Sequence, residues 1–288
     1  MFKMRWPIGK LKKYSKNPIL TPSKKNRFES AAVYNPTAVV KNNKVYLFYR
    51  AEQHYYSDYI SKICLAVGDG EKFKRKGLVI SPEKRYEKRG CEDPRICEID
   101  GKYYLTYVAF SGKKTSIALA ESSDLINWKK HGLIMRNTKS GCLLPRKIDG
   151  KYVLYFGDTN IYLAESKNLK EWKVYEEPVL TPRADNFDSR LVEAGCSLIT
   201  KKGIFLIYNS SDGDEYKVGY AMFSKNNPSK LISRTNKPVL FPGGHWEKYG
   251  KVNYVVFASG LVEKNGCYYL YYGGADKSIG LAIGKKIY

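Results

Sequence analysis

The chain has 288 residues, of which 50 are Lys or Arg and 28 are Asp or Glu, so its formal net charge is +22. This length is ample to bury a hydrophobic core, and the lack of a long apolar run or a signal peptide predicts a cytoplasmic protein with no membrane partner. The charge favours anionic partners, but the basic residues are scattered through turns, which argues against a nucleic-acid groove.

The cysteines and histidines do not form a metal-binding pattern. The six cysteines include no Cys-x-x-Cys pair, and His54, His131 and His245 do not lie at ligand spacing from them. Several cysteines occur in apolar, strand-like contexts, where a free thiol behaves as a small hydrophobe. We therefore expect no metal site and a reducing compartment.

After an arm at 1–30, the chain repeats one pattern of three strands five times. A short strand and an Asn-, Asp- or Gly-containing turn precede an aromatic strand with a central leucine, and a strand resembling Ile-x-Leu-Ala follows. The first strands are predicted at 37–40, 95–99, 143–148, 196–200 and 255–262, the central strands at 45–49, 103–107, 152–156, 204–208 and 268–272, and the third strands at 63–66, 117–120, 161–164, 218–221 and 279–282. A fourth, outer strand such as 173–175 completes each unit.

Repeats of this kind, spaced about 50 to 65 residues apart, are typical of the blades of a β-propeller. Five units predict an all-β, five-bladed propeller with a central funnel, and a large β-sandwich is the alternative. The chain has no internal linker, so we predict a single domain over residues 1–288. Residues 1–30 are expected to supply the arm and the strand that closes the ring, because a closed ring leaves no free sheet edge.

The first strand of each propeller blade lines the central channel, so the residues at its start are candidate ligand contacts. This places Asn35, Asp93 and Glu193 around one cavity, although they come from different blades. Basic residues occur at nearby positions of the repeats: Arg50, Arg95, Lys139, Arg146 and Arg190. Polar groups that converge in a largely aromatic funnel indicate a site for a small ligand.

Two segments carry carboxylates suited to glycosidic chemistry, in which one acid protonates the leaving oxygen while a base or nucleophile acts at the anomeric carbon. They are Glu92-Asp93 and Glu193. The alternative for the first pair is a purely structural role as hydrogen-bond acceptors. The alternative for Glu193 is simple neutralisation by Arg190. No Gly-x-Ser-x-Gly elbow and no phosphate-binding glycine loop before a helix is present.

Motifs along nearly the whole chain resemble glycoside hydrolase family 130, the β-mannoside phosphorylases and mannosidases. The matching segments are Asn35-Pro36, Tyr49-Arg50-Ala51-Glu52, Gly90-Cys91-Glu92-Asp93-Pro94-Arg95-Ile96, Thr138-Lys139-Ser140-Gly141, 187–195, and 271–276 with 279–282. The combination of Glu-Asp-Pro-Arg with Tyr-Arg-Ala one blade earlier is specific. The Leu-Val-Glu sequence at 191–193 resembles the members that act on β-1,2-mannosides.

The resemblance implies a five-bladed propeller and an inverting mechanism with Asp93 as the general acid. Phosphate then attacks the anomeric carbon of a β-1,2-linked manno-oligosaccharide, and the product is α-mannose 1-phosphate. The family pattern implies phosphate contacts from Arg50 and Lys139, with Arg190 alongside, because such groups neutralise and hydrogen-bond an oxyanion. Substrate contacts are assigned to four residues: Asn35, Arg95, Tyr254 and Asp276.

We predict a β-1,2-mannoside phosphorylase, with inorganic phosphate as co-substrate and neither metal nor organic cofactor. The alternative is an inverting β-1,2-mannosidase, in which Glu193 is the base that activates water. A glycan-binding propeller without activity is a third reading. The sequence leaves linkage, chain length and subunit number open, and a homo-oligomer is compatible with it.

Overall fold

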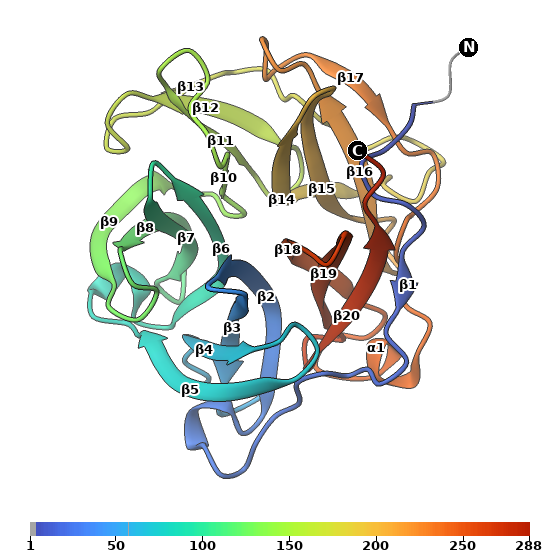
Figure 1. The fold of residues 1–288 in the computed structure, drawn as a ribbon. Coiled ribbons are helices and arrows are strands. Elements are labelled where there is room, and N and C mark those ends of the chain that lie inside the picture. Colours follow the sequence, from blue (N-terminus) through green and yellow to red (C-terminus); the bar gives the residue numbers. More distant parts are fainter. Residues whose placement is uncertain (1–3, 57) are drawn as a thin grey trace.

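The computed structural model describes residues 4–56 and 58–288 and is built almost entirely from β-strands. Five four-stranded antiparallel sheets are arranged around a central axis (Figure 1), which confirms the predicted five-bladed propeller. Blades one to four run outward in chain order: β2 (Ala32–Lys41), β3 (Lys44–Glu52), β4 (Lys62–Gly68) and β5 (Phe73–Ile80); β6 (Gly90–Ile99), β7 (Lys102–Phe110), β8 (Thr115–Ser122) and β9 (Lys129–Arg136); β10 (Cys142–Leu143), β11 (Tyr152–Phe156), β12 (Tyr162–Ser166) and β13 (Lys173–Val174); β14 (Leu191–Thr200), β15 (Gly203–Ser211), β16 (Tyr216–Phe223) and β17 (Leu231–Arg234).

Blade five combines the two ends of the chain. Its inner strands are β18 (Val256–Lys264), β19 (Cys267–Gly274) and β20 (Ser278–Lys285), and its outer strand is β1 (Lys12–Lys13). Strand β1 runs antiparallel to β20, with Lys12 opposite Ile283 and Lys13 opposite Ala282. The first three residues of the predicted arm lie outside the described residues.

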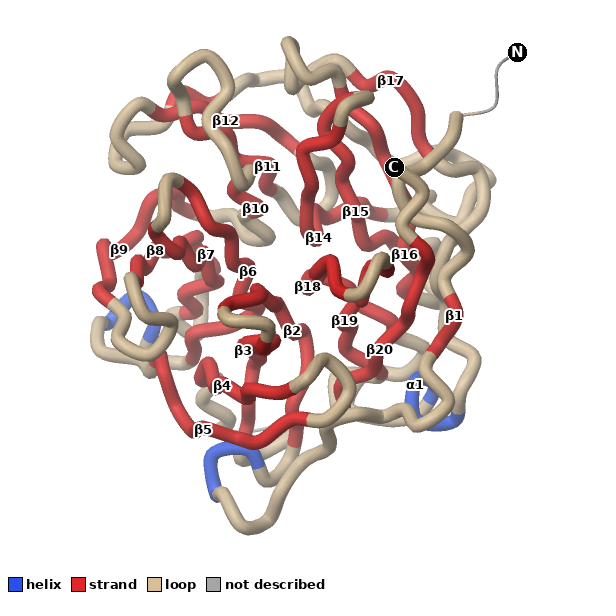
Figure 2. The backbone as a smooth tube through the Cα atoms, viewed as in Figure 1, coloured by secondary structure: helices blue, strands red, loops and turns tan. Residues whose placement is uncertain are grey.

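Helix is limited, within the described residues, to two short 3-10 turns and one helical turn, α1 (His245–Lys248). Figure 2 shows these three segments on the outside of the ring, with loops joining the blades. No helix in this part of the chain is long and apolar enough to cross a membrane.

The predicted strand 143–148 is wrong in its extent, because β10 contains only Cys142–Leu143. Pro145 follows two residues later and has no N–H to donate to a ladder. The segment regains pairing only at an isolated bridge between Ile148 and Lys151. Blade three therefore has the shortest inner strand of the five.

The other four inner strands contain a bulge at the same place. The register shifts lie between Tyr34 and Thr37, Glu92 and Arg95, Ala194 and Cys196, and Ala258 and Gly260. In blades one and two the bulge is an Asn-Pro or Asp-Pro pair, in which Asn35 and Asp93 have φ values of 46° and 47°. Asn and Asp tolerate this left-handed conformation, and a following proline suits a position outside the ladder. The bulge re-aims these side chains toward the funnel.

A second repeat, in the side chains, holds each blade together. In four blades the hydroxyl of a tyrosine on the second strand donates a hydrogen bond to a buried carboxylate, which lies before the inner strand. A cation from the outer strand forms an ion pair with the same carboxylate. We call each set a blade clasp. The four clasps are Tyr49–Glu29–Arg75, Tyr107–Glu87–Lys130, Tyr208–Asp188–Arg234 and Tyr272–Glu247–Lys13.

Blade three lacks the acid of the clasp. Its tyrosine, Tyr155, donates instead to the backbone carbonyl of Pro228 at 2.7 Å. In the clasp of blade two, burial by itself raises the pKa of Glu87, but hydrogen bonds from Lys130, the Glu83 backbone and Tyr107 lower it below its ordinary value. The buried carboxylate is therefore ionised at neutral pH, and each donor that reaches it stabilises the blade.

Replacing the clasp tyrosine of blade two should cost more stability than replacing its counterpart in blade three. We expect Tyr107→Phe to lower the free energy of unfolding by about 2 kcal/mol and Tyr155→Phe by about 1 kcal/mol, because the first removes a hydrogen bond to a charge. Denaturant unfolding at pH 7 measures both. The lowered pKa of Glu87 contributes stability that is lost in acid, so the two costs should converge as the pH falls through that pKa. Equal costs at pH 7 would contradict the charged acceptor.

Candidate active site

A cavity of about 240 Å³ lies in the channel where the bulged inner strands begin. Every blade except the third contributes to its wall directly, and the segment before β10 contributes Lys139. The lining residues are Asn35, Arg50, Glu92, Asp93, Val108, Thr115, Lys139, Glu193, Tyr216, Val252, Val255, Phe257 and Asp276. The cavity thus brings together six of the predicted site residues from separate parts of the sequence.

The guanidinium of Arg50 is the centre of the charge arrangement. It is buried, with 8% exposure, and contacts three carboxylates: Glu52 at 2.7 Å, Glu92 at 2.9 Å and Asp93 at 3.3 Å. Arg50 comes from β3 of blade one, whereas Glu92 and Asp93 come from β6 of blade two. The arginine therefore joins two blades at the cavity wall.

Glu52 anchors Arg50 from behind. This carboxylate is fully buried and accepts hydrogen bonds from Tyr34 at 2.7 Å and Ser61 at 2.9 Å, and it pairs with Lys251 at 2.5 Å. A buried charge with several charge-assisted partners is held in one geometry. Arg50 consequently presents its remaining N–H groups to the carboxylates at the cavity.

The two adjacent acids differ in their protonation. Burial raises the pKa of Glu92 to about 7, although Arg50 opposes the shift. Burial also acts on Asp93, but the charge of Arg50 and a 2.9 Å hydrogen bond from Asn35 outweigh it, so the pKa of Asp93 is lowered. The left-handed backbone at Asp93 allows it to reach Arg50 and Asn35 together. Asp93 is therefore the ionised acid, and Glu92 is poised to hold a proton.

Two further carboxylates complete the cavity. Burial raises the pKa of Asp276 to about 7, and this residue follows the end of β19 in a left-handed turn. Glu193 pairs with Lys139 at 3.3 Å and accepts a hydrogen bond from Ser140. The Glu193 carboxylate in turn raises the pKa of Lys139. The cavity therefore holds two cations and four carboxyl groups.

Three predicted residues do not line this cavity. Arg190 is exposed at the start of β14, Tyr254 packs against the ring of Tyr249 with 6.0 Å between ring centroids, and Arg95 lies behind Asp93. Strand geometry explains the first case, since Arg190 comes before the buried run that carries Glu193. We find no contact between Arg190 and the other two predicted phosphate ligands within the described residues.

Sequence reasoning missed Thr115, Tyr216 and Phe257, which line the cavity. The sequence repeat could have identified two of these residues, because they share one repeat position. Thr115 and Tyr216 each stand two positions before the first residue of an Ile-x-Leu-Ala strand, and Ser61, which supports Glu52 and Glu92, has the same repeat position. Aligning the third strands of the blades as closely as the first would have identified them.

Among residues 4–56 and 58–288, no group of three His, Cys, Asp or Glu side chains has the geometry to hold a metal ion. The cavity's four carboxyl groups are instead arranged around Arg50 and Lys139. A phosphate or another oxyanion that enters the cavity meets these same two cations.

The fold and the acid-lined cavity define a carbohydrate-active propeller. A family model described as beta-1,4-mannooligosaccharide phosphorylase, Glyco_hydro_130, matches residues 8–287. The chain therefore belongs to glycoside hydrolase family 130, as its motifs indicate.

Two relatives and one solved structure illustrate the likeness. The 1,2-beta-oligomannan phosphorylase of Thermoanaerobacter sp. (strain X514) is 40% identical, over 95% of this chain and 97% of the relative. The beta-1,2-mannobiose phosphorylase of the same strain is 36% identical, over 96% and 98%. A structure from work on GH130 glycoside hydrolases that target beta-1,2 mannosidic linkages in Candida mannan has a TM-score of 0.92 and 31% identity, and the match covers 98% of this chain and 95% of that one.

Anion binding in the cavity should weaken as Glu92 and Asp276 ionise. Both pKa values are about 7, so the cavity gains two negative charges between pH 6 and pH 8. We expect the dissociation constant of sulfate, which does not titrate in this range, to rise about tenfold over that interval. Calorimetric titration measures it. Asp276→Asn should reduce the rise, and Asp214→Asn on an exposed loop should leave it unchanged. A pH-independent constant in the wild-type protein would contradict the raised pKa values.

Proposed function

We propose that this protein is an inverting β-1,2-mannoside phosphorylase, which converts a β-1,2-linked manno-oligosaccharide and phosphate into α-mannose 1-phosphate and the shortened oligosaccharide. The observation that carries the proposal is the presence of Asp93, Arg50 and Lys139 in one cavity. The two Thermoanaerobacter relatives, which are named as β-1,2-mannoside phosphorylases, support it.

The proposed reaction exchanges one bond at the anomeric carbon. A phosphate oxygen forms a bond to that carbon from the face opposite the leaving oxygen, and the glycosidic bond breaks with inversion. Asp93 supplies the proton that the leaving oxygen takes up, and the family resemblance implies a relay through the O3 hydroxyl of the mannose. The released sugar keeps this proton, and the phosphate keeps the mannosyl group.

Phosphate binding itself prepares the acid. Arg50 and Asn35 by themselves keep the pKa of Asp93 low, which leaves the acid ionised. A phosphate anion beside Arg50 and Lys139 offsets their positive charge and raises the pKa of a neighbouring carboxyl group. The proton needed by the leaving oxygen is then held by Asp93 only when the nucleophile is in place. Glu92 and Asp276, in their protonated forms, keep the cavity from repelling the phosphate.

The second candidate function is an inverting β-1,2-mannosidase, and the Candida mannan structure is the observation that favours it. In that reaction Glu193 is the base that removes a proton from water. The contacts of Glu193 support phosphorolysis, because Lys139 and Ser140 engage both of its carboxylate oxygens. In the phosphorylase we assign Glu193 to a sugar hydroxyl, and we keep Asn35 and Asp276 as further substrate contacts.

The remaining features of the proposal concern context. Phosphate and manno-oligosaccharide are the partners, without metal, organic cofactor or nucleic acid. All six cysteines are free, which supports a reducing, cytoplasmic location. A homo-oligomer is compatible with the proposal. Arg190 and Tyr254, which do not line the cavity, stay predictions from the sequence.

Turnover of β-1,2-mannobiose should require phosphate. We expect α-mannose 1-phosphate and mannose in equal amounts with phosphate, and no release of sugar without it, because water lacks the charge that Arg50 and Lys139 bind. Phosphorus NMR together with a free-mannose assay measures both products. Equal rates of mannose release with and without phosphate, and no sugar phosphate, would establish the mannosidase instead.

The two acids should respond differently to removal of their charge. Asp93→Asn should lower kcat about 1,000-fold, since it removes the general acid. Glu193→Gln should lower kcat/KM about tenfold, because it weakens a hydrogen bond but leaves the acid in place. Steady-state phosphorolysis with mannobiose measures both variants. A loss in Glu193→Gln as large as that in Asp93→Asn would make Glu193 the catalytic base.

A further inference from the structure

Arg95 lies behind the cavity, where it links the backbones of the two strands that carry Asp93 and Glu193. Its Nη1 donates to the carbonyl of Asp93 at 3.0 Å, and its Nε donates to the carbonyl of Ala194 at 3.0 Å. Both carbonyls stand at the bulges of their inner strands. We propose that Arg95 is a positioning residue, which sets the placement of the catalytic acid relative to Glu193 and to the bound sugar. The inference rests on the proposed function in taking Asp93 as the acid.

The link passes the blade with the shortest inner strand, blade three. Other neighbouring inner strands are joined by short contacts, such as Ser259 to the Pro36 carbonyl at 3.0 Å and Thr37 to the Ile96 amide at 3.1 Å. Blade three is joined to its neighbours by Thr106 to the Gly141 carbonyl and by Cys142 to Ser197 at 3.6 Å, but its inner strand β10 has only two residues. The long side chain of Arg95 adds a direct link from blade two to blade four.

Arg95 forms no salt bridge with another described residue. The residue is 4% exposed, and no carboxylate of the described residues lies within salt-bridge distance of it. Its guanidinium carbon lies 5.8 Å from the centroid of the Phe257 ring, a cavity residue. A buried cation without an ionic partner is costly. The positive charge of Arg95 does act on the acid, because it contributes to the lowered pKa of Asp93.

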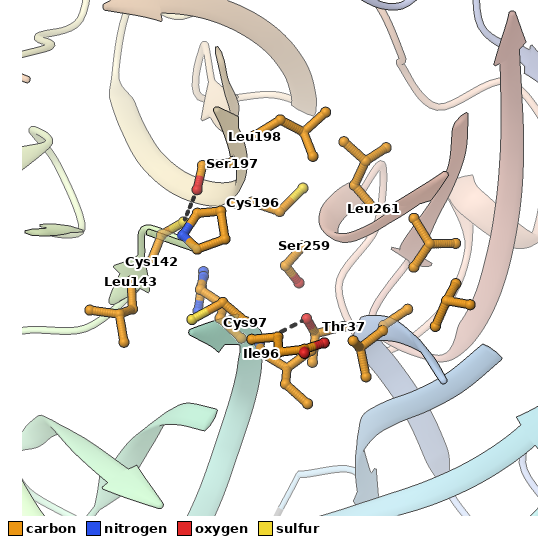
Figure 3. Close-up of a pocket in the computed structure, with 18 of the residues that line it drawn as sticks. Thr37, Ile96, Cys97, Cys142, Leu143, Cys196, Ser197, Leu198, Ser259 and Leu261 are labelled. Carbon is orange, nitrogen blue, oxygen red and sulfur yellow. Dashed lines mark hydrogen bonds between the residues drawn. The ribbon is translucent and has the colours of Figure 1, made fainter. Parts of the chain in front are cut away.

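Arg95 also lines a second cavity of about 220 Å³, which lies among the later residues of the inner strands (Figure 3). The figure shows Thr37, Cys97, Cys142, Ser197 and Ser259 around this space. Truncation of Arg95 enlarges that cavity and leaves room for a small planar cation at the vacated position. This geometry permits a rescue experiment, in which added guanidinium takes the place of the lost side chain.

The first test separates geometry from charge. Arg95→Met removes both, and we expect kcat to fall about 100-fold with little change in either KM, as for a displaced acid. The alkaline limb of the kcat profile should move up by about one pH unit, because the pKa of Asp93 rises when a nearby cation is lost. Arg95→Lys should lower kcat while the limb stays in place, since it keeps the charge but loses the paired hydrogen bonds. If Arg95 had only a structural role, the alkaline limb of the kcat profile would stay in place, and the loss would not fall on kcat alone while both KM values are kept.

The second test uses this second cavity. Guanidinium chloride, at concentrations that leave the wild-type protein folded, should raise the kcat of Arg95→Ala but not that of Asp93→Ala. Sodium chloride at equal ionic strength is the control. No rescue together with a wild-type pH limb in Arg95→Met would overturn the inference.

The third test does not depend on turnover. Carbon-13 NMR of the aspartate carboxyls, with Asp93→Asn to identify the resonance, should show Asp93 titrating at higher pH in Arg95→Met than in the wild type. If the wild-type protein is inactive on β-1,2-mannobiose, the proposed function fails and this titration alone decides the role of Arg95. An unchanged titration in a folded Arg95→Met would overturn the inference. If Arg95→Met does not fold, the same comparison is made with Arg95→Lys, whose Asp93 must titrate as in the wild type.

Discussion

The site depends on one buried guanidinium that serves three carboxylates. Arg50 cannot be left unpaired at this depth, and Glu52, Glu92 and Asp93 cannot all be ionised around it without a large cost in desolvation and repulsion. The three carboxyl groups therefore differ in their protonation. Glu52, supported by other donors, keeps its charge, Asp93 keeps its charge with the help of Asn35, and Glu92 shifts toward its neutral form. The protonation pattern of the cavity thus follows from the cations that act on each acid: Arg50 and Lys251 on Glu52, Arg50, Arg95 and Lys139 on Asp93, and Arg50 on Glu92.

The blade clasps fix the inner strands that present the polar side chains of the cavity. Each tyrosine, carboxylate and cation comes from a different layer of the blade, so a clasp joins the inner entrance, the central strand and the outer strand. The inner strands are thereby fixed at their entrances, a few residues before the bulges that present Asn35 and Asp93. Stability and catalytic geometry are coupled through the same short segment of each blade.

The sequence was sufficient for the blades and for the residues at their inner entrances. The central strands follow hydrophobic repeats and turn residues, which are local signals, and Asn35 and Asp93 stand beside prolines that mark the bulges. Arg190 and Tyr254 could not be placed, because proximity in sequence to Glu193 or to a strand does not say toward which side a side chain points. The extent of β10 was overestimated because the repeat was given more weight than Pro145. The clasps were missed because their acids lie outside the strands that were aligned, although a signal was present: the acid stands 20 residues before its tyrosine in three blades and 25 residues before it in the fifth.

The clasp of blade five has a consequence for the making of the protein. Its cation, Lys13, is synthesised long before its acid and its tyrosine, Glu247 and Tyr272. Until β20 is synthesised, β1 has no partner strand for its blade. The cavity receives its last wall, including Asp276, at the same moment. The cavity and the joint that closes the fifth blade therefore both wait for the same segment, residues 247–276, so a chain that lacks this segment cannot form the complete cavity.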